Sequence, residues 1–378
     1  LSGSRRTDGL LCDSPALKIP ASSPGRVRFQ PRIGPISAPP SHQGQTIKGI
    51  FMRYGRLAVA AIGATVLAAY LGNASWLAPE PDQPYFISHR GVHQTFDPTG
   101  VGPQDCTATR IAPVTHTFIE NTLPAIGAAF DAGAEIVEID IHPTTDNEFA
   151  VFHDWTLDCR TDGTGITREH SMAEIRSLDA GWGYTADDGA TYPLRGTGIG
   201  LIPSLGEVLD AFPGRRFVIN IKSNDPQEAE RLAAYLDARN IDPERLIVVG
   251  APAPLTRLAE LRPGIRQLSR RGLKDCALRY LLTGWSGFVP QACRNTVLIL
   301  PKNYARLAWG WPRRLEQRMA DANTLVWVMG DLDRATMNST GIDTLDALDA
   351  LPDGYSGGIW TNRIERVNPS ALGRQEVR

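Results

Sequence analysis

The stretch EIVEIDIHPTTDNEFAVFHD, residues 135–154, gathers carboxylates and histidines among apolar residues. Glu138 and Asp140 alternate with apolar residues in the run VEIDI, so in a strand both acidic side chains point to one face. Two ionised carboxylates this close repel each other unless a cation lies between them. A hard cation such as Mg²⁺ or Ca²⁺ prefers such oxygen ligands. Taken alone, the pair is equally compatible with a solvated strand face or an ion pair with a basic side chain.

A polar turn joins this run to a second one that ends at His153 and Asp154. We expect Asp146 and Asn147 to form a two-residue hairpin loop, because both residue types tolerate a positive φ. That register would place Asp140 opposite His153. A lone histidine in this position is more often structural, but beside a metal-binding pair it becomes a candidate general acid or base.

Polar residues also follow apolar runs in two other parts of the chain. His89 ends one run and is followed by Arg90 and Gly91. Glycine permits a sharp turn, and the arginine guanidinium offers a planar set of donors suited to phosphate. Asn220 and Lys222 share a face at the end of FVINIK, where they would supply a neutral oxygen ligand and a positive charge. Considered alone, Lys222 is equally well explained as a solvated lysine past a strand.

The candidate residues need elements that bring distant parts of the chain together. Strands are predicted at Tyr85–Ser88, Ile136–Ile141, Phe149–Phe152, Phe217–Ile221, Leu246–Val249, Arg266–Ser269, Thr296–Leu300, Leu325–Val328 and Gly358–Trp360. Helices are predicted at Thr122–Ala132, Ser171–Ser177, Ser204–Ala211, Gln227–Ala238, Pro254–Leu261, Pro312–Ala322 and Thr344–Leu351. Ser204 with Glu207 three residues later indicates a capping box, and Asp225-Pro226 indicates another helix start.

Alternating strands and helices of this number predict a parallel α/β barrel, in which catalytic side chains lie at the carboxyl ends of the strands. The polar residues described above fall at such ends. An open dinucleotide-binding sheet is disfavoured, because no GxGxxG sequence follows the first strand.

The composition limits the classes of function. The chain has 378 residues, of which 42% are hydrophobic and 21% charged, and its formal net charge is −2. It can therefore bury a full core, and it has no overall positive field that would attract nucleic acid, so no nucleic-acid partner is expected.

The chain divides into four predicted regions. Residues 1–51, rich in Ser, Pro, Gly and Arg, are expected to be a disordered or spurious N-terminal extension. Residues 52–78 begin with two arginines before an uncharged run and predict a signal peptide or a membrane anchor helix. Residues 79–84 are a linker, and residues 85–378 form the predicted catalytic barrel domain.

The apolar region bears on location. Arginines before an apolar run favour keeping that end in the cytoplasm, so the barrel is expected to be exported or membrane-anchored outside the cytoplasm, in the periplasm if the source is bacterial. Gly72-Asn73-Ala74 could serve as a cleavage site. If the helix is retained, residues 57–78 offer a means of membrane association.

Four cysteines lie in the predicted barrel domain, at positions 106, 159, 276 and 293. The simplest pairing in an exported chain joins Cys106 to Cys159 and Cys276 to Cys293. Buried free thiols are equally compatible with the sequence.

Four motifs in order, HRG at 89–91, ENT at 120–122, EID at 138–140 and HD at 153–154, resemble those of the glycerophosphodiester phosphodiesterases. The resemblance implies a TIM (β/α)8 barrel of the phosphodiesterase type, preceded here by a hydrophobic N-terminal helix. It implies an enzyme that uses one divalent cation, Mg²⁺ or Ca²⁺, and two histidines. The implied reaction hydrolyses a small or lipid-derived glycerol phosphodiester to an alcohol and glycerol 3-phosphate.

The resemblance also implies roles for individual residues. His89 and His153 would be the acid/base pair, Arg90 and Lys222 would bind the substrate phosphate, and Glu138 and Asp140 would bind the metal. Glu120, just before a predicted helix, is expected to cap that helix or support the site, with direct approach to the metal slightly less favoured. Asp154 is expected to be a supporting residue of the site.

This sequence departs from the family pattern in two places. A third acidic metal ligand is usual two residues before the lysine, but that position is Asn220. With one negative charge fewer, Asn220 would make a weaker metal ligand. The 28 residues between Gly91 and Glu120 form an unusually long loop, expected to line the pocket mouth and to hold His93 and His116 at its surface.

Two alternative functions share the same residues. One is a phospholipase D-like enzyme acting on lysophospholipids or sphingomyelin. The other is a catalytically impaired barrel that binds phosphate ligands, which only Asn220 supports.

Overall fold

The computed structural model describes residue 34 and residues 43–98, 100–102, 105–335 and 338–372. The chain divides into two compact units, Leu1–Ala61 and Ile62–Arg378, and the second unit contains the barrel. The prediction for residues 1–51 lies largely outside the described residues.

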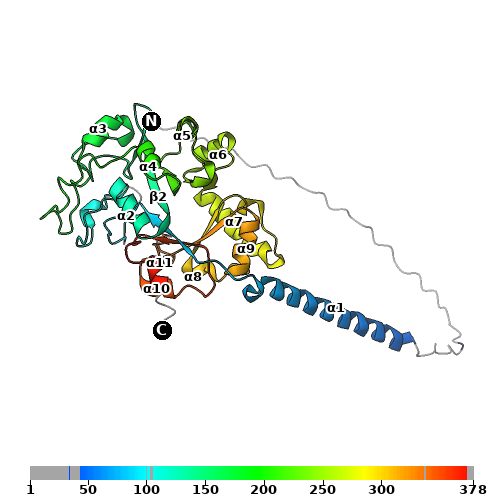
Figure 1. The fold of residues 1–378 in the computed structure, drawn as a ribbon. Helices are drawn as coiled ribbons and strands as arrows, with labels where there is room; N and C mark the ends of the chain where they lie inside the picture. Colours follow the sequence, from blue (N-terminus) through cyan, green and yellow to red (C-terminus); the bar gives the residue numbers. More distant parts are fainter. Residues whose placement is uncertain (1–33, 35–42, 99, 103–104, 336–337, 373–378) are drawn as a thin grey trace, which may run out of the picture. The chain divides into compact units, whose positions relative to one another are not determined.

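The described part of the chain contains nine strands, eight of which form a nearly closed barrel. Figure 1 shows the fold. The strands are β1 (Tyr85–His89), β2 (Ala134–Pro143), β3 (Phe149–Val151), β4 (Arg216–Ile221), β5 (Leu246–Val249), β6 (Arg266–Leu268), β7 (Val297–Pro301), β8 (Leu325–Met329) and β9 (Gly358–Thr361). Eight of them run in the order β6-β5-β4-β2-β1-β9-β8-β7 with parallel pairing, and β3 pairs only with β2. One parallel bridge, Gln267 to Thr296, closes the circle between β6 and β7.

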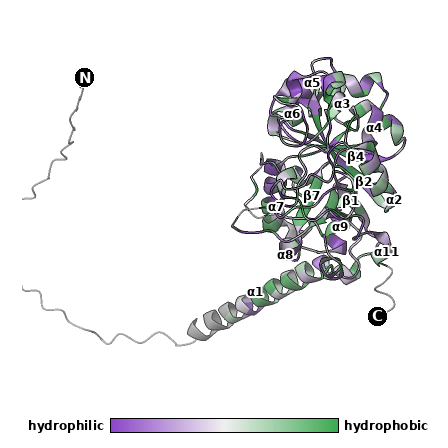
Figure 2. Ribbon diagram, turned by 90° about the vertical axis from the view of Figure 1, so that its left-hand side faces the viewer, coloured by the Kyte–Doolittle hydropathy of each residue, from purple (hydrophilic) through white to green (hydrophobic). Residues whose placement is uncertain are grey.

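Helices surround the strands (Figure 2). In the second unit they are α2 (Leu123–Asp131), α3 (Met172–Ser177), α4 (Leu205–Ala211), α5 (Pro226–Ala238), α6 (Pro252–Leu261), α7 (Arg270–Thr283), α8 (Lys302–Ala305), α9 (Arg313–Asp321), α10 (Leu345–Asp349) and α11 (Pro369–Leu372). The side chain of Ser204 accepts a hydrogen bond from the Glu207 amide and completes the predicted capping box of α4, and Asp225 caps α5.

The predicted barrel is confirmed, and each predicted strand is present to within a few residues at its ends. The sequence prediction missed α7, because Gly272 and the charged start of the helix obscure its apolar period. It also missed α8 and α11, which have four residues each and are too short to show a period.

Alternation along β2 separates the core from the site. Ile136 joins Ile87, Val218 and Trp327 in the apolar filling of the barrel, whereas Ile139 packs in the cluster between strands and helices. Glu138 and Asp140 continue the inward face of Ile136 toward the carboxyl end of the strand. The strand therefore buries both carboxylates inside the barrel mouth.

The hairpin after β2 corrects the predicted register. His142 pairs with Ala150, and the Phe152 amide donates to the Asp140 carbonyl, so Asp140 lies opposite Phe152 rather than His153. The loop contains three residues, the last of which is Asn147 with a φ of 63°. Three-residue hairpin loops commonly end with a residue in the left-handed region. Compared with a two-residue loop, this one shifts the pairing of β2 with β3 by one residue.

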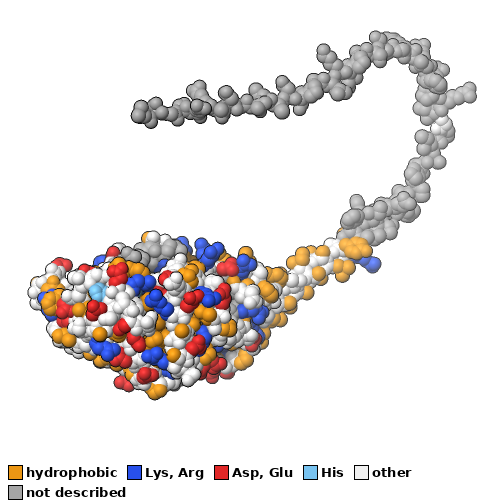
Figure 3. Space-filling model, turned by 90° about the horizontal axis from the view of Figure 1, so that it is seen from above, with side chains coloured by type: hydrophobic (Ala, Val, Ile, Leu, Met, Phe, Trp, Pro, Cys, Tyr) orange, Lys and Arg blue, Asp and Glu red, His pale blue; other side chains and the backbone are white. Residues whose placement is uncertain are grey.

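Both disulfides proposed from the sequence are present: Cys106 with Cys159, and Cys276 with Cys293. Helix α1 (Gln43–Asn73) begins within the predicted extension. Its segment Met52–Asn73 is long and apolar enough to cross a membrane by length and composition. On the face shown in Figure 3, acidic and basic side chains of the barrel are interspersed, consistent with a formal net charge of −2.

The capping box gives a direct test of how α4 is stabilised. Ser204→Ala removes the acceptor for the Glu207 amide, so the free energy of unfolding should fall by about 1 kcal/mol. The measurement is urea denaturation followed by circular dichroism. Ser177→Ala is the control, because this exposed hydroxyl bonds only to the Glu174 carbonyl. Equal losses in the two variants would contradict the capping role.

Candidate active site

Three neighbouring parallel strands bring the predicted site residues to one end of the barrel. His89, at the end of β1, pairs with Glu138 of β2. Two residues later Asp140 pairs with Asn220 of β4, and Lys222 follows that strand directly. Because parallel strands end at the same edge, the sheet register alone places these side chains together.

Asp140 is completely buried and lies among four nitrogen donors. Its Oδ1 accepts hydrogen bonds from Asn220 Nδ2 over 2.9 Å and Lys222 Nζ over 3.2 Å. Its Oδ2 lies 3.2 Å from Arg90 Nε and accepts from Asn121 Nδ2 over 3.1 Å. Burial alone would raise the pKa of Asp140, but the charges of Lys222 and Arg90 hold it well below its usual value. Asp140 is therefore a compensated buried anion.

Glu138 is the opposite case. It is buried, and among the described residues its Oε2 accepts no hydrogen bond. The nearest basic group recorded is His89 Nε2, at 3.8 Å. Burial, and next the negative charge of Asp140, raise the pKa of Glu138 to about 8. A buried carboxyl oxygen without a partner indicates a ligand position that the protein itself does not fill.

These residues fit a divalent cation in part. No group of three or more His, Cys, Asp and Glu side chains in the described part of the chain is arranged to hold a metal. The site offers instead the unpartnered Oε2 of Glu138, the carboxylate of Asp140 and the neutral amide of Asn220. Oxygen donors of this type suit Mg²⁺ or Ca²⁺, with fewer charges than a three-carboxylate site.

His89 is fixed by a chain of hydrogen bonds from the last strand. Asn362 Nδ2 donates to Asp343 Oδ2 over 2.8 Å, so its Oδ1 faces His89 Nδ1 at 2.7 Å. The ring also lies against Trp360, with centroids 5.4 Å apart. Burial and the charge of Arg90 lower the pKa of His89 well below its usual value. His89 is therefore neutral, with Nδ1 as donor and Nε2 directed into the site.

His153 is oriented by the carboxylate next to it in sequence. Its Nδ1 lies 2.6 Å from Asp154 Oδ1. Burial would raise the pKa of Asp154, but Arg160 and the hydrogen bond from His153 lower it to about 2. Asp154 is thus ionised and accepts the Nδ1 proton, which leaves the lone pair on Nε2. Burial and Arg90 lower the pKa of His153 itself.

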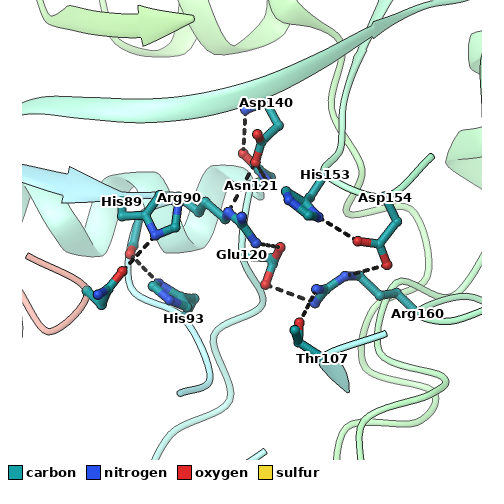
Figure 4. Close-up of polar contacts among 12 residues, drawn as sticks. His89, Arg90, His93, Thr107, Glu120, Asn121, Asp140, His153, Asp154 and Arg160 are labelled. Carbon is teal, nitrogen blue, oxygen red and sulfur yellow. Dashed lines mark hydrogen bonds and ion pairs between the residues drawn. The ribbon is translucent and has the colours of Figure 1, made fainter. Parts of the chain in front are cut away.

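A buried arginine that the sequence analysis did not identify connects the two halves of the site (Figure 4). Arg160 is 2% exposed and donates to Glu120 Oε2 over 2.9 Å and to Asp154 Oδ2 over 2.8 Å. It also donates to Tyr184 Oη and Thr107 Oγ1. Thr107 and Arg160 directly follow the two cysteines of one disulfide, which holds their segments together. In the sequence, the only indication of Arg160 was its position shortly after the HD motif.

Glu120 lies between two arginines. Its Oε1 accepts from Arg90 Nη1 over 3.0 Å, and its Oε2 accepts from Arg160. Burial would raise its pKa, but Arg160 and Arg90 lower it to about 2. The expectation that Glu120 caps the following helix is wrong, because Thr122 is the N-cap of α2. Glu120 instead positions Arg90.

The backbone at Arg90 requires glycine beside it. Arg90 has a φ of 59° and Gly91 a φ of 77°. A Cβ atom on Gly91 would lie 2.7 Å from the backbone of Ala125, at the start of α2. The glycine of the HRG motif therefore lets the chain turn sharply against a helix and aim Arg90 at Asp140.

The long loop after Gly91 corrects one expectation. His93 was expected at the loop surface, but it is buried, and its ring packs edge-on against His89 with centroids 5.7 Å apart. His93 Nδ1 lies 3.2 Å from the Gly91 carbonyl oxygen. The distance between His116 Nδ1 and Gln94 Nε2 is 3.0 Å. The loop therefore packs against the site at its first residues.

The chain is similar to known proteins over the segment that carries these motifs. A model of the glycerophosphoryl diester phosphodiesterase family matches residues 89–244. A glycerophosphodiester phosphodiesterase of Caldanaerobacter subterraneus is 30% identical over 134 residues, covering 34% of this chain and 51% of the relative. One of Bacillus subtilis is 30% identical over 158 residues, covering 39% and 53%. The chain thus spans about half the length of these curated relatives.

Solved structures share the fold. The glycerophosphoryl diester phosphodiesterase domain of a Mycobacterium tuberculosis protein aligns over 79% of this chain and 100% of its own, at 17% identity and a TM-score of 0.52. A glycerophosphoryl diester phosphodiesterase from Parabacteroides distasonis aligns over 79% and 88%, at 16% identity and a TM-score of 0.50. Residues 89–244 thus match the glycerophosphoryl diester phosphodiesterase family, and the barrel has the fold of these solved structures.

Proposed function

We propose that this protein hydrolyses glycerophosphodiesters to an alcohol and glycerol 3-phosphate with a divalent cation. The observation that carries the proposal is that two oriented histidines, two cationic side chains and an unpartnered oxygen of Glu138 meet at one end of a barrel of this kind. The relatives' printed name, glycerophosphodiester phosphodiesterase, supports the same reaction.

The histidines have different partners, and this suggests different roles. The partner of His153 is the ionised Asp154, which stabilises an imidazolium, whereas the partner of His89 is a neutral amide. We therefore assign His89 as the base that accepts the proton of the attacking hydroxyl. His153 is the acid: its Nε2 first takes up a proton from solvent, Asp154 stabilises the resulting imidazolium, and that proton then passes to the leaving alkoxide.

Arg90 and Lys222 are the phosphate-binding groups of the proposal. Both lie beside Asp140, so their positions are fixed before a substrate arrives. Preorganised donors of this kind stabilise negative charge that develops in the transition state. A divalent cation held by Glu138, Asp140 and Asn220 would further neutralise charge on the phosphoryl oxygens.

We also propose that the barrel is held outside the cytoplasm by α1. Arg318 donates to the Gly72 carbonyl and to Asn73 Oδ1, each over 2.8 Å. Asn73 Nδ2 donates in turn to the Trp285 carbonyl over 2.8 Å. The predicted cleavage site Gly72-Asn73-Ala74 is thus bonded to the barrel, which supports retention of the helix as an anchor.

The acid/base assignment is tested by substitution. His89→Ala and His153→Ala should each lower kcat by about 10²-fold or more, because each removes one proton transfer. Glycerol 3-phosphate and choline release from glycerophosphocholine and from lysophosphatidylcholine are the measurements, with and without chelator. His170→Ala, a histidine of another loop, should leave turnover unchanged. Full activity of the first two variants would refute the assignment, and full activity after complete chelation would refute the role of the metal.

The position of Asn220 makes a prediction about metal affinity. Asn220→Glu adds a third carboxylate beside Glu138 and Asp140, so Mg²⁺ or Ca²⁺ should bind roughly tenfold more tightly or better. Calorimetric titration of the chelator-treated protein measures this. Asn220→Gln keeps the amide and controls for side-chain length. The proposed ligand set fails if the Glu variant binds no more tightly than the Gln variant.

Replacing Arg160 is predicted to destabilise the protein. Arg160→Met leaves Glu120 and Asp154 buried with one cation fewer, so the free energy of unfolding at neutral pH should fall by about 3–5 kcal/mol. Urea denaturation measures the difference. Arg231→Met, at an exposed site on α5, should change stability little. A small effect at Arg160 would mean that water or rearrangement compensates the two carboxylates.

A further inference from the structure

Helix α7 has two apolar faces, of which only one packs against the barrel. Cys276 and Tyr280 point inward, and Cys276 is tied to Cys293 by a disulfide. The outer face carries apolar side chains at helical spacing. These are Leu278, Leu281 and Leu282, which are 52%, 41% and 76% exposed, and Trp285 in the 3-10 turn Gly284–Ser286 directly after α7, which is 45% exposed. A soluble surface helix normally turns such a stripe toward the core, so this second stripe points to a partner.

Residues from the loop after α8 extend this stripe. Trp309 Nε1 donates to the Leu281 carbonyl over 2.9 Å, and Tyr280 Oη donates to the Trp309 carbonyl over 2.8 Å. Trp309 and Leu307 are themselves 40% and 56% exposed. The hydrogen bonds hold the loop beside the end of α7, so the two exposed tryptophans belong to one surface.

The end of the apolar helix α1 meets the same surface. Asn73 bonds to the Trp285 carbonyl, and Ser75 Oγ donates to the Gly310 carbonyl over 2.8 Å. Trp76 and Leu77, the next residues, are exposed. The exposed apolar residues of the barrel are therefore continuous with the point where the candidate membrane helix ends.

The segment that forms this surface is strongly basic. Residues 270–318 contain ten Lys and Arg residues and two Asp and Glu residues, although the whole chain has a formal net charge of −2. Arg270, Arg271, Lys274 and Arg279 are exposed on α7 itself. Aromatic and aliphatic side chains flanked by basic ones match the interface of a bilayer with anionic lipids.

We propose that this basic apolar surface, formed by Leu278, Leu281, Leu282, Trp285, Leu307 and Trp309 with the basic residues of α7, docks on an anionic lipid bilayer. The proposal rests on the proposed retention of α1 as an anchor, and adds a second contact through the barrel. The exposed leucines and tryptophans enter the headgroup region, and Arg270, Arg271, Lys274 and Arg279 face anionic lipid phosphates. The barrel is thereby held against the membrane instead of moving freely on its linker.

The test uses the full chain inserted in vesicles with brominated lipid, which quenches tryptophan fluorescence on contact. Phosphatidylcholine vesicles are compared with vesicles that also contain phosphatidylglycerol. Quenching should be stronger with phosphatidylglycerol and should weaken at high salt. The double variant W285F/W309F should lose most of this lipid-dependent quenching. The matched double variant W155F/W182F should keep it, because Trp155 and Trp182 are 38% and 40% exposed but lie on other loops.

Two outcomes separate this proposal from the ones on which it rests. Vesicle flotation reports whether α1 anchors the chain, and glycerol 3-phosphate release reports the activity. If the chain floats with vesicles and W285F/W309F shows the same quenching as the unsubstituted chain, the docking surface is refuted while the anchor stands. The double variant R271E/K274E reverses two charges on α7, and R231E on α5 is its control. Recognition of anionic lipid is refuted if phosphatidylglycerol increases the quenching equally in the two variants and in the unsubstituted chain.

Discussion

The site depends on the compensation of one buried charge, that of Asp140. With no exposed surface, an ionised carboxylate is tolerated only if cations and hydrogen-bond donors surround it. Arg90, Lys222, Asn220 and Asn121 meet this need, and they come from three different segments of the chain. The ends of β1 and β4 and the ENT loop are therefore bound to β2 through this carboxylate.

From Asp140 the charges alternate through the site in one continuous chain. The order is Lys222, Asp140, Arg90, Glu120, Arg160, Asp154 and finally His153. Each buried anion in this chain contacts at least one cation, which explains why so many ionised groups fit inside a barrel mouth. Glu138 alone stands outside the alternation with an oxygen that accepts no hydrogen bond from the described residues. The open oxygen of Glu138 therefore supports the proposal that this carboxyl helps to hold an added cation.

Much of this could be predicted from local patterns, and the parts that could not have a physical reason. The period of two along β2 predicts that Glu138 and Asp140 share a face, and strand–helix alternation predicts the barrel. The hairpin register depends on whether two or three residues form the loop, and the sequence permits both. Arg160 reaches the site only through tertiary packing, because nothing near it in sequence distinguishes a buried arginine from an exposed one.

Asn220 now has an explanation within this balance. Its amide nitrogen donates to Asp140, so the free site is satisfied at that oxygen without a cation. A carboxylate at the same position would add a third acidic group beside Glu138 and Asp140, and a bound metal would offset the added repulsion. The amide of Asn220 therefore stabilises the metal-free site. For the same reason, it should lower the affinity of the site for a metal. In the proposed mechanism, the departure at Asn220 thus changes the balance between two states of one site, while His89, His153, Arg90 and Lys222 are kept in place.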